Sequence, residues 1–166
     1  MLALLGLGLI VYLVGVTHDL PYVVQRDEYG IYAFTSAQIA STHDLRPTRL
    51  NHPASTIFYP LALVYKVWHV IARQGMLFRP DPNLLLAYYN EPGIFLLLGR
   101  LVAVFYAVLS LPLVYLLGKR VHGRTAGVIA AWLLATTPIL TTLAQIIRDD
   151  SATVFFSTLA ILLVLE

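Results

Sequence analysis

Residues 94–117 read IFLLLGRLVAVFYAVLSLPLVYLL, an apolar run interrupted only by Gly99, Arg100, Ser110 and Pro112. A helix needs about 20 consecutive, mostly apolar residues to cross the hydrocarbon core of a bilayer. This run is long enough, so it predicts a membrane-spanning helix.

The composition of the whole chain agrees with that prediction. Of 166 residues, 58% are hydrophobic and only 12% are charged, whereas a soluble domain carries about 25% charged residues. So few polar side chains cannot cover a water-facing surface, which indicates a chain solvated by lipid. The net charge of +2 fits membrane orientation better than nucleic-acid binding, and the absence of cysteine excludes disulfides and Cys metal sites.

The predicted fold class is an all-α integral membrane protein with about four transmembrane helices. Residues 1–166 are interpreted as a single transmembrane module, with juxtamembrane helices in a long outer loop, residues 18–93. No cleaved signal peptide is expected, because the sequence starts without a basic region or a cleavage site. The last span is short, and the chain is expected to stop inside it. The predicted spans are approximately 2–17, 94–117, 125–147 and 152–166.

The orientation depends on Gly118–Arg124 (GKRVHGR), the densest basic cluster, which contains no acid. The positive-inside rule places this loop in the cytoplasm. A further apolar stretch, Thr56–Ala72, leaves two topologies open: the N-terminus lies outside if this stretch crosses, and is cytoplasmic if it lies along the membrane. We favour the second, because Lys66 and His69 suit an interfacial helix. The chain is then a multi-pass protein of the plasma (inner) membrane.

The outer loop is expected to be ordered. Residues 28–42 carry Ile31, Phe34 and Ile39 among polar neighbours, which predicts an amphipathic helix. Asn51-His52-Pro53 is expected to open a second helix, with the proline in its first turn. Pro92 is placed in the same way at the start of the next span.

The first candidate site is the acid pair Asp27-Glu28, which follows Arg26 just outside the first span. A carboxylate at the lipid–water boundary could act as the general base for an acceptor hydroxyl. The structural alternative is that Asp27 caps the following helix and Glu28 lies in its first turn.

The second candidate is Arg148-Asp149-Asp150 in the turn before the last helix. These carboxylates could bind a sugar, a basic partner or a metal. A divalent metal has little support, because no His or Cys cluster accompanies them. The structural alternative is an N-cap at Asp150 or Ser151, with Arg148 pairing locally.

Arg100 and His52 complete the set. An ionisable residue inside a span usually faces the protein interior or a polar cavity, but Arg100 also lies close enough to the outer end to reach the interface. His52 is more simply a helix cap. The predicted topology gathers these groups at one membrane face, where acids above a buried arginine would suit a lipid phosphate carrying a sugar. The gathered residues are Asp27, Glu28, His52, Arg148, Asp149 and Asp150, with Arg100 beneath.

Four features, in this order, carry a family resemblance: Asp27-Glu28 after the first span; Asn51-His52-Pro53 followed by Phe58-Tyr59; Leu98-Gly99-Arg100-Leu101 leading to Gly118–Arg124; and Thr136-Thr137-Pro138 with 148–156 (RDDSATVFF). With them the chain resembles the N-terminal part of the GT-C membrane glycosyltransferases. That group contains the protein O-mannosyltransferases and the aminoarabinose transferase of lipid A.

The resemblance implies transfer of a sugar from a polyprenyl-phosphate donor to an extracytoplasmic acceptor. It maps the family's catalytic acid onto Asp27, with Glu28 beside it, and the acid of the second outer loop onto Asp150 in preference to Asp149. Arg100 and Arg148 would neutralise the donor phosphate. Apart from this lipid-linked sugar no cofactor is indicated with certainty, and a divalent metal has only weak support. Family members are several times longer, so the chain is expected to represent only their N-terminal part and to be catalytically incomplete alone.

The alternative function is a non-catalytic accessory subunit of a larger membrane protein complex, surrounded by membrane lipids. Small residues recur near a spacing of three to four from residue 126 to residue 135, which allows close helix packing. They are Ala126, Gly127, Ala130, Ala131 and Ala135.

Overall fold

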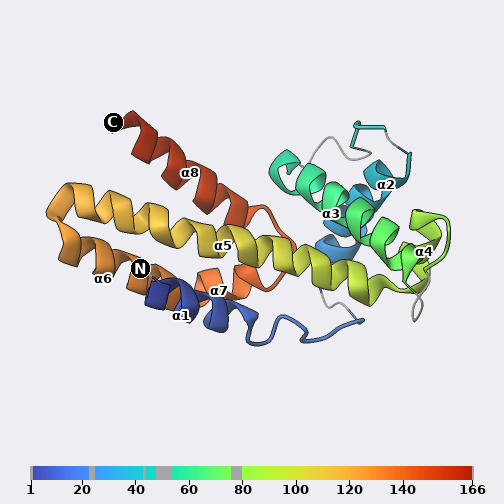
Figure 1. Ribbon diagram of the computed structural model, residues 1–166, viewed down its shortest axis with the longest axis horizontal. Helices are drawn as coiled ribbons and strands as arrows, with labels where there is room; N and C mark the ends of the chain where they lie inside the picture. The colour runs from blue at the N-terminus through green and yellow to red at the C-terminus, as the bar shows by residue number, and fades with distance from the viewer. Residues whose placement is uncertain (1, 23–24, 43, 48–53, 76–79, 166) are drawn as a thin grey trace. The chain divides into compact units, whose positions relative to one another are not determined.

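The computed structural model describes residues 2–22, 25–42, 44–47, 54–75 and 80–165. Within these residues every regular element is a helix, so the predicted all-α class is confirmed (Figure 1). The elements are α1 (Leu2–Leu13), the π-helix η1 (Glu28–Ala33), α2 (Phe34–Thr42), α3 (Ser55–Gln74), α4 (Leu84–Asn90), α5 (Pro92–His122), α6 (Arg124–Thr136), α7 (Pro138–Ala144) and α8 (Asp150–Val164).

Among the described residues, two helices are long and apolar enough to cross a membrane, α3 and α5. The 31 residues of α5 extend for about 46 Å, since each residue adds roughly 1.5 Å, more than the hydrocarbon thickness of about 30 Å. A third span results if α6 and α7, bent by 58° at their junction, are counted together. The apolar helices Ala3–Leu13 and Asp150–Val164 are shorter. These helices are those of a membrane protein, while the predicted position of α3 along the membrane stays a prediction.

The chain divides into two compact units, which are described separately. The first unit contains Met1–Val16 and Ala103–Glu166. In it α6 returns alongside α5, and α1 lies against α6 (Figure 1). The α5–α6 contact is close because it is made at glycines: a Cβ added to Gly127 would lie 2.5 Å from the carbonyl oxygen of Tyr115. Gly127, Ala131 and Ala135 are buried, so the small-residue face of α6 packs within this unit.

The second unit, Thr17–Val102, is built around an aromatic core. Tyr65 of α3 is fully buried, and its hydroxyl donates to the carbonyl of Phe95 at 2.8 Å. The ring of Phe95 also packs against Trp68 and Tyr88, with ring centroids 5.1 and 5.5 Å apart. This core joins α3, α4 and the first turns of α5, and it supports the segment that carries the acid pair.

The helices predicted in the outer loop are largely present. Residues 28–42 are helical as predicted, with a π-helical first part, and Pro92 is the first residue of α5. The Asn51-His52-Pro53 opening lies outside the described residues, and α3 is described from Ser55.

Candidate functional site

The site begins at Asp27, the residue that precedes η1. Its backbone has helical dihedral angles (φ −69°, ψ −33°), and its side chain is exposed and makes no capping hydrogen bond. A capping side chain normally requires extended dihedral angles at that position. The interpretation of Asp27 as a helix cap is therefore wrong, and its carboxylate remains at the surface of the second unit.

Glu28, the next residue, is fully buried and forms a two-bond ion pair with Arg100 of α5. Arg100 Nε donates to Glu28 Oε1 at 2.7 Å, and Nη2 donates to Oε2 at 2.9 Å. A third guanidinium nitrogen, Nη1, donates to the carbonyl of His18 at 2.7 Å. Bidentate arginine–carboxylate bonds are strong and directional. The pair therefore fixes the start of η1, and with it Asp27, against α5.

Arg100 is 4% exposed, which confirms that it faces the protein interior. Breaking a buried ion pair by removing one partner typically costs about 3–5 kcal/mol, because the remaining charge is left uncompensated. Nε, Nη1 and Nη2 are all bonded within the protein, so the phosphate-binding role expected for Arg100 stays a prediction.

A second contact holds η1 through Tyr29. The buried Tyr88 of α4 donates its hydroxyl to the carbonyl of Tyr29 at 2.8 Å, and the two rings stack with centroids 5.2 Å apart. Burial, followed by the neighbouring Tyr29, raises the pKa of Tyr88 above its usual value. Tyr88 therefore stays protonated and can donate throughout the neutral range.

The surface around the acid pair is hollowed. A hollow of about 390 Å³ includes both neighbours of the acid pair, Arg26 and Tyr29, in its lining, together with Pro21, Tyr22, Gln25, Gly30 and Pro92. A second hollow of about 470 Å³ shares Pro21 and Pro92 and is lined mainly by apolar residues such as Leu20, Ile94 and Leu97. A cationic, aromatic hollow next to an apolar one could receive a ligand with a charged head and a hydrocarbon chain.

The Arg148-Asp149-Asp150 group belongs to the first unit. Arg148 Nε lies 2.9 Å from Asp150 Oδ2, and both side chains are about one-third exposed, which confirms the local pairing. Asp149 occupies the N-cap position of α8 without a side-chain capping bond, and Asp150 is the first residue of the helix, so the N-cap expected at Asp150 or Ser151 is wrong. The predicted gathering of these acids with Asp27 stays a prediction.

The remaining predictions concern His52 and a metal. His52 lies outside the described residues. Within the part of the chain that the structure describes, no group of three or more His, Asp and Glu side chains is placed to hold a metal ion.

The sequence indicates Glu28 and Arg100 separately but not that they pair. The available signal was general: an arginine inside a span requires a partner, and Glu28 is among only 9 acidic residues in the chain. Nothing in the local sequence around Tyr88 indicates that it contacts Tyr29.

Together, the helices and this site define an all-helical membrane protein with a buried carboxylate–arginine pair beside an exposed acid. The chain belongs to the dolichyl-phosphate-mannose-protein mannosyltransferase family, whose model matches residues 57–166. No curated protein and no solved structure matches the chain.

Family membership confirms the resemblance drawn from the sequence and supports a mannosyltransferase kind of function. Arg100 and the Arg148-Asp149-Asp150 group lie within the matched residues, whereas Asp27, Glu28 and His52 precede them.

Proposed function

We propose that this chain takes part, within the native protein, in the transfer of a mannosyl group from a dolichyl- or polyprenyl-phosphate donor. The acceptor is a hydroxyl group of a protein at the extracytoplasmic face of the membrane. The family match supports this class of reaction. The outer face follows from the basic Gly118–Arg124 loop, which the positive-inside rule assigns to the cytoplasm.

In the proposed reaction Asp27 is the general base. Its carboxylate takes the proton of the acceptor hydroxyl while the hydroxyl oxygen forms a bond to the anomeric carbon of the mannosyl group. The bond from that carbon to the phosphate oxygen breaks, and the lipid phosphate leaves with the electron pair. Atoms and charge balance without a redox partner.

The observation that carries the proposal is the division of roles within the acid pair. Glu28 is buried and bonded to Arg100, so it is a positioning residue, whereas Asp27 is exposed and makes no capping bond. A general base must be held in place and must also reach its substrate. The buried pair provides the first property, and the exposed carboxylate provides the second.

The hollow lined by both neighbours of the acid pair and the apolar hollow that shares Pro21 and Pro92 with it offer places for the donor, although Asp27 itself lines neither. Arg26 lines the smaller one and could neutralise the phosphate, while the apolar lining of the larger one could accept the first isoprene units. Arg148 and Asp150 remain candidates for contacts with donor or acceptor from the first unit.

The test is mannosyl transfer by the native protein in proteoliposomes, with a radiolabelled lipid-phosphate mannose donor and a serine- and threonine-containing acceptor peptide. Asp27→Asn is expected to lower kcat by about 10²–10⁴-fold, the usual contribution of a general base. The matched control is Asp44→Asn, because Asp44 is another exposed carboxylate of the second unit. Transfer by Asp27→Asn at the control rate would refute the role.

A further inference from the structure

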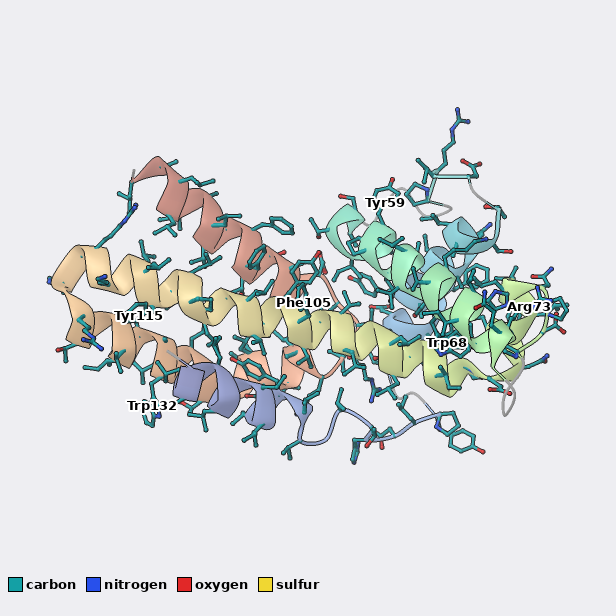
Figure 2. All side chains as sticks on the ribbon, in the orientation of Figure 1. Tyr59, Trp68, Arg73, Phe105, Tyr115 and Trp132 are labelled. Carbon is teal, nitrogen blue, oxygen red and sulfur yellow. The ribbon has the colours of Figure 1, made fainter. Side chains whose placement is uncertain are left out.

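A separate set of basic side chains lies on the C-terminal half of α3. Lys66, His69 and Arg73 are spaced by three and four residues, which places them on the same side of the helix. Figure 2 labels Arg73 in this part of α3. The site proposed for transfer uses none of these three residues.

These side chains line two adjoining hollows of about 450 and 460 Å³. Lys66, His69 and Pro82 line both, so the hollows form one continuous depression, called here the basic groove. No carboxylate lines it among the described residues. The further lining residues are Ser41, Asn83 and Leu84 in the first hollow and Val70, Arg73 and Gln74 in the second.

Backbone carbonyl groups hold the polar ends of the Lys66 and His69 side chains in place. Lys66 Nζ lies 3.4 Å from the carbonyl oxygen of Ala40, at the end of α2. His69 Nε2 lies 2.8 Å from the carbonyl oxygen of Asp81, and because a carbonyl only accepts, Nε2 carries the proton. The Asp81 carboxylate accepts from the backbone N–H of Asn83 at 2.8 Å and is not part of the lining. The groove is therefore a fixed, net positive depression.

An apolar face of the same helix adjoins the groove. Leu63, Val67, Val70 and Ile71 are 47–64% exposed, and Val70 itself lines the second hollow. In a membrane protein, exposed apolar side chains on a long helix are solvated by acyl chains. A phosphate placed between Lys66 and Arg73 would therefore have its hydrocarbon beside this face.

We infer that the basic groove binds the phosphodiester headgroup of an anionic phospholipid, with the acyl chains along the exposed face of α3. Lys66 and Arg73 supply the charge, and the side chains of Ser41 and Asn83 can donate hydrogen bonds to the phosphate oxygens. A juxtamembrane basic residue strengthens binding to anionic lipid by about fivefold. Losing both charges should weaken binding by about 25-fold.

The probe is phosphatidylglycerol, added to the purified full chain in a mild neutral detergent, with retained lipid counted by native mass spectrometry. Phosphatidylcholine is the neutral-lipid control. We expect Lys66→Gln/Arg73→Gln to weaken phosphatidylglycerol binding by about 25-fold relative to the wild type. Arg46→Gln, which removes an exposed charge of the second unit outside the groove, is the control for each single variant and should bind as the wild type does.

Three results would overturn the inference: equal binding of the two lipids by the wild type, unchanged binding by Lys66→Gln/Arg73→Gln, or displacement of phosphatidylglycerol by millimolar inorganic phosphate. The last result would identify the groove as a site for a free anion. Trp68 fluorescence and helical circular dichroism show whether each variant is folded. If the double variant does not fold, Lys66→Arg/Arg73→Lys keeps both charges and must retain binding, while each single glutamine variant must lose about fivefold.

Discussion

Substitution of Glu28 by glutamine tests the buried ion pair that holds the acid segment. In the variant, the glutamine carbonyl oxygen can still accept from Arg100 Nε. The glutamine NH₂ group, however, replaces the carboxylate oxygen Oε2, which in the wild type accepts from Nη2 at 2.9 Å. Two donors then face each other. Arg100 remains only 4% exposed, and its Nη1 still donates to the carbonyl of His18, which carries no charge. Leaving a buried charge uncompensated in this way costs about 3–5 kcal/mol. We therefore expect Glu28→Gln to lower the free energy of unfolding of the second unit by that amount.

The assay can follow the second unit alone. The chain has two tryptophans, Trp68 in the second unit and Trp132 in the first. In a Trp132→Phe background, Trp68 fluorescence during denaturation in mixed micelles reports the packing of α3 against Phe95. Glu91→Gln is the matched control, since Glu91 is an exposed carboxylate of the same unit and should change stability by less than about 0.5 kcal/mol.

A double variant then tests whether the unpaired charge causes the loss. Glu28→Met/Arg100→Met removes both charges, and hydrophobic replacement of a buried pair is often neutral or stabilising. The double variant should thus be more stable than Glu28→Gln. A loss below about 1 kcal/mol in Glu28→Gln, or a double variant no more stable than the single one, would refute the reasoning.

Two further predictions concern packing and pH. Gly127→Ala should destabilise the first unit by about 1–3 kcal/mol, because the added methyl meets backbone atoms of α5 that cannot move aside; Trp132 fluorescence in a Trp68→Phe background measures this. Gly6→Ala is its control, since nothing lies within 4 Å of the added Cβ, and equal effects would contradict the prediction. Because burial raises the pKa of Tyr88 above 10.0 in the folded state, the stability that it contributes is present below about pH 10 and is lost as pH rises further. Between pH 8 and 11 the free energy of unfolding, followed by Trp68 fluorescence, should therefore fall less in Tyr88→Phe than in the wild type. An equal fall in both proteins would contradict this prediction.

The fold class and the family were predictable because they depend on features that the sequence states directly. With 12% charged residues the chain cannot cover a soluble surface. Pro92 marks the start of α5 because proline lacks the N–H that a first-turn position leaves unbonded anyway. These are local or compositional properties, and they need no knowledge of which segments meet.

The contacts within the site could not be predicted in this way. Glu28 and Arg100 are 72 residues apart, and no periodicity encodes such a partnership. The sequence allows a cap at Asp27 because Asp is a common cap, but this residue, which precedes η1, already has helical dihedral angles. His69 was expected to suit an interface, yet it is buried because the segment around Asp81 returns to it and supplies a carbonyl.

The central claim is that Asp27 is the general base and that Glu28 and Arg100 hold it in place. It is tested most directly by the single-turnover rate of mannosyl transfer with donor already bound, which separates the chemical step from binding. We expect Asp27→Asn to slow this step by about 10²–10⁴-fold and to leave donor affinity unchanged. A single-turnover rate for Asp27→Asn equal to that of Asp44→Asn would contradict it.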